Sequence, residues 1–573
     1  MLIYSLNMLL KTAIAKMIGE ALKQLNAKMS QTEIESALKP PPMPELGDFA
    51  FPCFSLAGLM KKNPAETAAL LKNALKPNLT VSRVEAAGPY LNFFGNETRL
   101  AEQTIKTVLK EKQKYGHNKL KNDRLMVEFP SPNTNKPLHL GHLRNMAIGE
   151  SVCRLLEAGG NKVIRANLNN DRGVHICKSM LAYQKFGRNA QPNEKTDHFV
   201  GDFYVRFSKE LKNNPKLQDE AQALLVKWEK KDPETIKLWK KMTKWALDGF
   251  KQTYKNFGIK HDVTYFESQL YDKGKEIIRA GLKKDIFKKR GDGAVLIDLT
   301  DDGLDEKILL RPDGTAVYIT QDLFLAKLKD DKYKLNGSIY VVGSEQEYHF
   351  KVLFLILKKL GFKFADNLKH LSYGMVMLPE GRMKSREGTA VDADDLIEEV
   401  RRLAEAELKK RYQLLAPELK KRSLKIALAA LKYHLLRPDI NKTIVFNPKE
   451  SISFDGNTGP YILYAYARAG SIIKKSGRRT MPLKITSLNQ QERNLINKIS
   501  NLPEIVLKAS RERNPAPIAH FSYDLAQTFN EFYHQCPVIG SDNESLRWNL
   551  TNAFRQTLKN ALYLLGIETI ETM

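Results

Sequence analysis

The chain has 573 residues, of which 42% are hydrophobic and 9% aromatic. A single hydrophobic core stops growing near about 250–300 residues, so we expect two to four domains, and the ordinary composition excludes a largely disordered chain. Lysine and arginine total 91 against 65 aspartate and glutamate, a net charge of +26. This surplus favours a polyanionic partner such as nucleic acid, although charge alone also fits a merely basic protein.

The cysteines and the apolar segments limit which metal sites, which cellular compartment and which membrane segments we expect. The cysteines show neither a CxxC pair nor the spacing of a metal site, so we expect no structural zinc, no protein-bound metal and a reducing cytoplasm. Lys11 and Lys16 interrupt the apolar N-terminal stretch, which predicts a helix rather than a signal peptide. No apolar run reaches the roughly 20 residues that span a bilayer, so we expect no membrane. The four cysteines are Cys53, Cys153, Cys177 and Cys536.

In chain order, residues 9–38 have helical periodicity, and a Lys-Pro-Pro-Pro run at 39–42 breaks it. The mixed segment that follows, up to residue 94, completes a small α/β domain. From residue 122 the pattern changes to short β-type runs at 125–129 and 162–166, each bounded by helix or turn signals, which predicts a parallel sheet.

The later part of the chain is predicted to be mainly helical. Residues 187–258 are rich in lysine with helical spacing and indicate an insertion between the halves of the sheet. After Asp392 nearly everything has helical spacing, and residues 401–439 carry a basic excess that suits RNA or, equally, a solvated helix face. We therefore predict an α/β protein with domains at 1–118, 119–400 and 401–573.

Residues 128–142 place a loop between a predicted strand and a predicted helix. His139 and His142 lie at the start of that helix, and Gly141 between them removes a side chain. Backbone N–H groups, the helix dipole and two imidazoles then converge on an anion, which favours a nucleotide phosphate. Paired histidines are more often structural or metal-linked, but no further metal ligands lie nearby at a suitable spacing.

The run His139-Leu140-Gly141-His142 resembles the HIGH signature of class I aminoacyl-tRNA synthetases. Residues 131–133, 136–137, 141–145 and 163–167 resemble the arginyl branch of that family. Residues 170–173 read Asn-Asp-Arg-Gly where the family usually has Gly-Asp-Trp-Gly, so the side-chain roles of Asn170 and Arg172 differ here. A turn that retains Asp171 and Gly173 forms as easily with either sequence.

A second landmark of the class is a basic loop that contacts the ATP phosphates. Residues 381–388 supply three cations within five residues between glycines and can offset charge on a departing pyrophosphate, although such a loop by itself is more often a surface turn. Residues 382–385 resemble a degenerate KMSK loop in which Ser385 stands at the usual final lysine. Arginyl enzymes commonly show this departure, and the resemblance implies that Lys136, before the histidine motif, substitutes for that lysine.

Tyr318 and Asp322 are four residues apart and share one face if their segment enters a helix. A carboxylate can bind both nitrogens of a guanidinium while a tyrosine hydroxyl fixes its orientation, so the pair suits arginine. The alternative is that Asp322 is an ordinary helix N-cap.

The resemblance implies the following fold, activity and site residues. The fold is a Rossmann-like parallel-sheet catalytic domain with a helical insertion, a small α/β N-terminal domain and an all-α anticodon-binding domain. The activity is arginyl-tRNA synthesis from L-arginine, ATP with Mg²⁺, and tRNA(Arg) by a monomer. Catalytic residues would be Lys136, His139, Gly141, His142, Lys384 and Arg386; ATP-binding residues Pro132, Asn133, Leu140, Met383 and Ser385; and arginine-binding residues Glu128, Asn133, His139, Tyr318, Asp322 and Gln346.

Contacts with tRNA are expected at both ends of the chain. Asn92 and Phe94 lie in a segment similar to the N-terminal domain of arginyl enzymes, and Tyr461 and Arg468 lie in one similar to the start of the anticodon-binding domain. Exposed bases of RNA loops are read by stacking and by their edges, which suits these residue types, with core packing as the rival explanation.

Two other functions remain open at this point. One is another adenylate-forming class I ligase, but the cysteinyl type commonly carries a Cys/His zinc site and the pantothenate type lacks a long helical RNA domain. The other is an RNA-binding paralogue without enzymatic activity, which should have lost His139, His142 or Asp322; all three are present.

Overall fold

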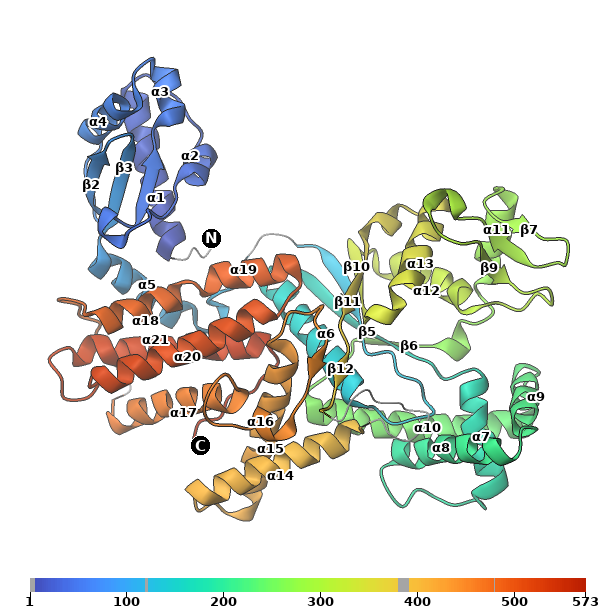
Figure 1. The fold of residues 1–573 in the computed structure, drawn as a ribbon. Helices are drawn as coiled ribbons and strands as arrows, with labels where there is room; N and C mark the ends of the chain where they lie inside the picture. The colour runs from blue at the N-terminus through green and yellow to red at the C-terminus, as the bar shows by residue number, and fades with distance from the viewer. Residues whose placement is uncertain (1–5, 119–121, 380–390, 479, 573) are drawn as a thin grey trace.

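The computed structural model describes residues 6–118, 122–379, 391–478 and 480–572. Its first part is a small α/β unit at one end of the molecule (Figure 1). The predicted helical stretch 9–38 holds two helices rather than one, because Ser30 forms a capping box with Glu33 and starts a second helix. The unit comprises α1 (Leu6–Gln24), α2 (Gln31–Ala37), α3 (Phe54–Met60), α4 (Pro64–Ala74) and the antiparallel sheet of β1 (Phe49–Pro52), β3 (Tyr90–Gly95) and β2 (Val81–Ala87).

A five-stranded parallel sheet forms the centre of the molecule, in the order β11-β10-β4-β5-β6. The predicted strands at 125–129 and 162–166 are its neighbours β4 (Arg124–Glu128) and β5 (Lys162–Asn169). The chain proceeds from β4 to one side of the sheet and later returns to the other side, so the strand order reverses at β4. In such sheets ligands bind beside the reversal, at the carboxyl ends of the strands. The other strands are β6 (Val263–Phe266), β10 (Gly337–Gly343) and β11 (Leu368–Tyr373).

Helix α6 (Leu140–Ala158) follows β4 and is covered on two sides. It packs against β5 and β10 of the sheet and against α15 and α19 of the C-terminal part. Its side chains are therefore buried nearly all round, in the pattern expected of a helix inside a large protein.

Two further units interrupt the sheet. Four helices stand between β5 and β6, and a small antiparallel sheet stands between β6 and α12 (Tyr318–Tyr333). The helices are α7 (Val174–Phe186), α8 (Thr196–Asn213), α9 (Leu217–Glu229) and α10 (Pro233–Phe257), and the strands are β7 (Lys288–Lys289), β8 (Val295–Ile297) and β9 (Lys307–Leu310).

The C-terminal part is helical, as predicted, apart from the short strand β13 (Ile444–Val445), which pairs with β12 (Val376–Met377). The predicted α/β class with a Rossmann-like sheet and a helical C-terminal domain is thus confirmed. Among the described helices, none has the length and hydropathy needed to cross a membrane. The helices are α14 (Ala393–Arg411), α15 (Ala416–Leu436), α16 (Pro448–Ser451), α17 (Gly459–Lys475), α18 (Gln490–Ser500), α19 (Leu502–Glu512), α20 (Ala516–Gln535) and α21 (Glu544–Leu564).

Candidate active site

The loop that follows β4 is bonded to the loop that follows β5. The N–H of Thr134 donates to the carbonyl of Asn170, and the N–H of Asn170 donates to the carbonyl of Pro132, both at 3.0 Å. Asn133 lies between these bonds and pairs with Asn170 in a parallel bridge. The predicted residues Pro132 and Asn133 therefore lie at the carboxyl edge of the sheet, where the strand order reverses.

Helix α6 begins at the histidine motif. His139 is its N-cap, and its Nδ1 accepts a hydrogen bond from the N–H of Gly141 at 3.1 Å, while Nδ1 of His142 accepts from the N–H of His139 at 3.1 Å. The two ring centroids are 4.0 Å apart. Because each Nδ1 is an acceptor, each neutral ring carries its proton on Nε2 and can donate it to a ligand. The predicted pair of imidazoles at a helix N-terminus is confirmed.

Both histidines are neutral at pH 7. Burial, with the positive charge of Lys136 added, lowers the pKa of His139 to about 4. Burial and the neighbouring His139 hold the pKa of His142 well below its usual range. Lys136 lowers the pKa of both rings, so its positive charge acts on the motif. The site therefore offers two neutral donors and a nearby positive charge to an anion.

Gly141 is required by the position of the His139 ring. A Cβ at residue 141 would lie 2.9 Å from Cε1 of His139, closer than such atoms approach in proteins. Any larger residue would displace the ring from the helix N-terminus. The other predicted phosphate-binding residues, Met383, Lys384, Ser385 and Arg386, lie outside the described residues.

Two polar residues in the next turn of the helix, Arg144 and Asn145, connect α6 to other segments. The guanidinium of Arg144 is fully buried and donates to the carbonyls of Met375 and Lys442 at 2.7 Å and of Ile440 at 3.2 Å. Asn145 donates to the carbonyl of Val341 in β10 at 2.7 Å. These bonds fix α6 relative to the sheet and to the C-terminal domain.

Tyr318 and Asp322 lie on the first turns of α12, four residues apart and on one face. The helix begins at Tyr318 with Val317 as N-cap, so the N-cap alternative for Asp322 is wrong. The carboxylate of Asp322 is part-buried and lies 2.8 Å from Nε2 of His349. Tyr318 is 61% exposed, which leaves its ring accessible to a ligand.

Glu128 and Gln346 stand at the ends of neighbouring strands. Glu128 ends β4, is buried, and its Oε2 accepts from Nζ of Lys329 at 2.5 Å, so part of its charge is already balanced by α12. Gln346 follows β10, is exposed, and serves as N-cap of α13 (Glu347–Lys359). Both lie at the same edge of the sheet as Asn133, although only Gln346 is open to solvent.

The turn at residues 170–173 forms despite its departures from the family sequence. Asp171 accepts from the N–H and the hydroxyl of Ser268 at 2.8 and 2.7 Å. Arg172 is paired with Glu229, and its guanidinium lies 4.3 Å from the ring centre of Tyr271. Arg172 therefore links the sheet to the helical insertion, and it lines a cavity of about 580 Å³ together with Tyr318 and Gln321.

Glu267 is a candidate that the sequence analysis missed. Its side chain is 5% exposed, and Oε1 has no hydrogen-bond partner among the described residues. Burial, opposed by Arg172 and aided by the carboxylates of Asp171 and Asp322, raises its pKa to about 7. Its signal in the sequence is its place directly after β6, since carboxyl ends of parallel strands meet at one edge. A cationic ligand between Glu267 and Asp322 would ionise it.

The candidate tRNA contacts differ in their exposure. Asn92 is 5% exposed, which fits the packing alternative, and Phe94 is half-buried under the guanidinium of Arg83 at 3.7 Å. Arg468 donates to Oδ1 of Asn530 at 2.8 Å and lines a cavity of about 650 Å³ with Tyr464 and Tyr533. Tyr461, two turns earlier on α17, accepts from the same Asn530 at 2.9 Å. Arg468 thus lies in a cavity that is lined in part by aromatic side chains.

Three protein families match successive parts of the chain. Residues 9–94 match the arginyl tRNA synthetase N-terminal domain, residues 104–447 the catalytic domain of class I (R) tRNA synthetases, and residues 462–573 the DALR anticodon binding domain. The catalytic-domain match includes the histidine motif, Tyr318 and Asp322. These matches favour neither a cysteinyl nor a pantothenate-type ligase.

Whole proteins match along nearly the full chain. The arginine–tRNA ligase of Borrelia turicatae is 43% identical, covering 98% of this chain and 99% of that protein, and that of Treponema denticola is 44% identical, covering 98% and 100%. The structure of the Thermus thermophilus arginyl-tRNA synthetase superposes with a TM-score of 0.77 at 26% identity, covering 98% of this chain and 99% of that one. The motif geometry, the domain matches and these relatives agree, and the chain belongs to the arginyl-tRNA synthetase family of class I aminoacyl-tRNA synthetases.

Proposed function

We propose that the protein is an arginine–tRNA ligase. It activates L-arginine with ATP to arginyl-adenylate and transfers the arginyl group to the 3′ end of tRNA(Arg), giving arginyl-tRNA, AMP and diphosphate. The observation that carries the proposal is the pair of imidazoles at the N-terminus of α6, beside the carboxyl edge of the sheet. His139 and His142 are the candidate anion site, and Asp322 on α12 is the candidate partner for the guanidinium.

In the first step, the arginine carboxylate attacks the α-phosphorus of ATP in line and the pyrophosphate leaves. His139 and His142 donate through Nε2 to the phosphate oxygens, where the transition state gains charge, and Lys136 stabilises the pyrophosphate. Lys384 and Arg386 share this role by family resemblance, with Pro132, Leu140, Met383 and Ser385 beside the nucleotide. The protein forms no covalent bond in this scheme, so the acceleration comes from positioning and preorganised charge.

Arginine binds through its guanidinium and its backbone groups. Asp322 holds the guanidinium and Tyr318 orients it, while Glu128, Asn133, His139 and Gln346 surround the amino acid. Glu267 adds a second carboxylate, supported by its burial and its unpartnered Oε1. A neutral or shorter side chain would leave Oε1 of Glu267 without a partner and Asp322 with His349 alone, so binding of other amino acids would be weaker.

The tRNA contacts the two terminal domains. We assign residues 1–118 to a tRNA-recognition domain, 119–400 to the catalytic domain with its insertion at 187–258, and 401–573 to the anticodon-binding domain. Phe94, Tyr461 and Arg468 contact the tRNA, whereas the buried Asn92 is better explained by packing. Arg468 has the strongest support, because a part-buried guanidinium beside Tyr464 and Tyr533 suits a stacked base.

We propose that Mg²⁺ arrives with ATP. Asp197, His198 and Asp394 have the spacing of metal ligands, but the ammonium of Lys195 already contacts both carboxylates. This supports a metal carried by the nucleotide, which would neutralise charge on the phosphates. We further propose a cytoplasmic monomer without structural zinc, in keeping with cysteines that are all buried and free.

Aminoacylation of tRNA transcripts tests the proposal. Purified protein should attach labelled arginine to tRNA(Arg), and lysine, citrulline or ornithine should give no product at the same concentration. Citrulline is the sharpest comparison, since it replaces the guanidinium by a neutral urea of nearly the same shape. Charging of citrulline at a similar rate, or of tRNA(Arg) with another amino acid, would refute the assignment.

A further inference from the structure

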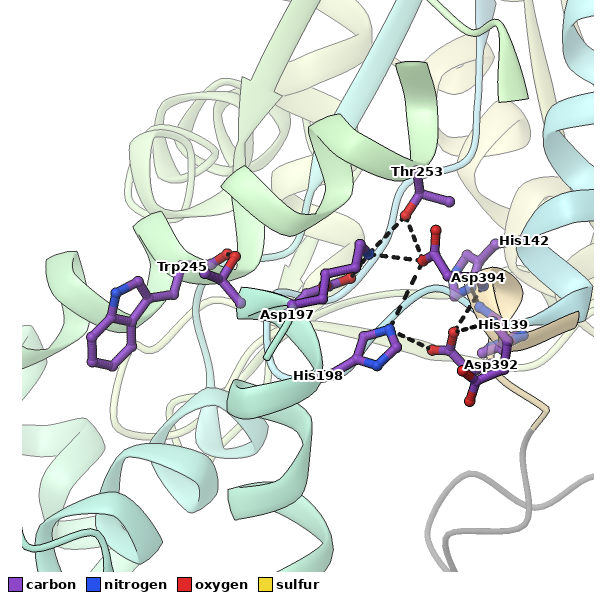
Figure 2. A network of polar contacts seen from close by, with 11 residues as sticks. His139, His142, Asp197, His198, Trp245, Thr253, Asp392 and Asp394 are labelled. Carbon is purple, nitrogen blue, oxygen red and sulfur yellow. Dashed lines mark hydrogen bonds and ion pairs between the residues drawn. The ribbon is translucent and has the colours of Figure 1, made fainter. Parts of the chain in front are cut away.

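Lys195 joins three segments of the chain, and Figure 2 shows the polar network to which its partners Asp197, Thr253 and Asp394 belong. Nζ of Lys195 donates to Oδ2 of Asp197, to Oγ1 of Thr253 and to Oδ2 of Asp394, each at 2.8 Å. Thr253 in turn donates to the same oxygen of Asp394 at 2.8 Å. These contacts connect the start of α8 and the end of α10, both in the helical insertion, to the start of α14.

His198 adds a second cation to the same network. Its Nε2 lies 3.2 Å from Oδ2 of Asp392 and 3.8 Å from Oδ2 of Asp394, and Figure 2 shows its ring facing both carboxylates. These carboxylates raise the pKa of His198 to about 10, so the imidazole is protonated at pH 7. The other oxygen of Asp392 caps α14 by accepting from the N–H groups of residues 394 and 395.

The network is largely shielded from water. The side chain of Asp197 is fully buried, and those of Lys195, Asp392 and Asp394 are 15%, 11% and 18% exposed. A buried charge costs free energy unless it is paired. Moving any one of these side chains away from its partners would therefore be unfavourable. Two cations among three carboxylates therefore fix the start of α14 against the insertion.

The start of α14 in turn fixes the histidine motif. The N–H of Leu140 donates to the carbonyl of Val391 at 3.1 Å, and the N–H of Ala393 donates to the carbonyl of Leu138 at 2.9 Å. Between these bonds, His139 and Asp392 face each other in an antiparallel bridge. Displacement of Asp392 would therefore displace the backbone of His139.

We propose that Lys195 and His198 are positioning residues for His139: they hold residues 391–393 beside residues 138–140 and so keep the imidazole in place for the nucleotide phosphate. The inference rests on the proposed function and extends it, because it makes the helical insertion part of the catalytic apparatus. An insertion that moved away would take the start of α14 with it, and a displacement of about 1 Å at a catalytic group can cost about 100-fold in rate.

The test compares Lys195→Met, Thr253→Val and Lys195→Arg with the wild-type enzyme. Lys195→Met removes the cation, Thr253→Val removes one hydroxyl and gives a milder variant if the first fails to fold, and Lys195→Arg retains the charge. Lys244→Ala is the matched control, because Lys244 forms an exposed ion pair with Asp248 on α10 away from the network. Two readouts are needed: steady-state ATP–pyrophosphate exchange with arginine, ATP and tRNA(Arg), and the NMR signal of ¹³Cε1-labelled His139, assigned with His139→Asn.

We expect Lys195→Met to lower kcat about 10- to 100-fold with the KM for arginine within twofold of wild type, and to shift the His139 signal. Thr253→Val should do the same to a smaller degree, Lys195→Arg should recover most of the rate, and Lys244→Ala should change neither readout. A folded variant with wild-type kcat, or a loss of kcat with an unmoved His139 signal, would overturn the inference. If the wild-type protein shows no exchange, the proposed function fails. The positioning role is then judged from the His139 signal alone: a shift of that signal in Lys195→Met supports the role, and an unmoved signal refutes it.

Discussion

At the scale of single residues, the proposed function makes recognition of arginine depend most directly on Asp322. Asp322→Asn keeps the shape and removes the charge. A hydrogen bond to a charged group contributes about 1.5–3 kcal/mol, so the KM for arginine should rise about 10- to 100-fold while the KM for ATP stays within about twofold. Asp331→Asn, at an exposed pair with Lys327 on the same helix, is the control. Equal arginine KM values for the two variants would remove Asp322 from the binding site.

His139 should contribute to the pH dependence of the free energy of unfolding. Its pKa is about 4 in the folded protein because of burial, and near 6.5 in an unfolded chain. Between these values His139 is protonated in the unfolded chain and neutral in the folded protein. The contribution of His139 to the free energy of unfolding is therefore fully present above pH 6.5 and is lost as the pH falls toward 4.

Between pH 7 and pH 5, this linkage amounts to about 2 kcal/mol from His139. The stability of His139→Asn should therefore decline less over that interval than the wild type, by a similar amount. Chemical denaturation at both pH values measures the difference. Parallel declines would show that His139 is not held neutral by burial.

At the scale of secondary-structure elements, α6 depends on close packing beneath the histidine motif. A Cβ at Gly149 would lie 2.4 Å from Cγ of Phe129, a fully buried ring. Gly149→Ala gains about 1 kcal/mol of helix propensity but overpacks the core at a cost of about 1–3 kcal/mol, so the melting temperature should fall.

Gly58→Ala is the contrasting variant on another helix. No atom lies within 4 Å of a Cβ at Gly58 in α3, so this substitution should leave the melting temperature unchanged or raise it slightly. Differential scanning calorimetry of both variants measures the contrast. If Gly149→Ala were as stable as Gly58→Ala, the packing of α6 against Phe129 would be looser than described.

The same elements show what local sequence can and cannot predict. The strand, loop and helix around His139 were predictable because hydrophobic pattern, glycine and helix start all lie within about 30 residues. Glu267 was not predictable, because its position at the edge of the sheet depends on the pairing of β6 with β5 across a long helical insertion. Such tertiary pairing cannot be derived from local sequence. The Lys329 partner of Glu128, 201 residues away, was hidden for the same reason. Residues 9–38 were predicted as a helical stretch because periodicity continued across a break that Asn26, with a positive φ, and the N-cap Ser30 mark.

At the scale of the whole molecule, tRNA must contact a surface that extends over separate domains. Arg468→Ala removes the guanidinium between Tyr464 and Tyr533, and the KM for tRNA should rise about 10-fold or more, since stacking of one base contributes about 1–3 kcal/mol. The KM for arginine should not change. Lys498→Ala, an exposed pair with Asp524 outside the cavity, is the control. A tRNA KM that is the same for both variants would move the anticodon contact elsewhere.

ATP–pyrophosphate exchange with purified protein, with and without tRNA(Arg) and across the standard amino acids, tests the central claim most directly. Exchange that depends on arginine alone among the amino acids is the predicted result, and the comparison with and without tRNA(Arg) measures whether activation needs the tRNA. The absence of exchange with arginine under both conditions, in folded protein that still binds tRNA, would contradict it and indicate an RNA-binding relative without ligase activity.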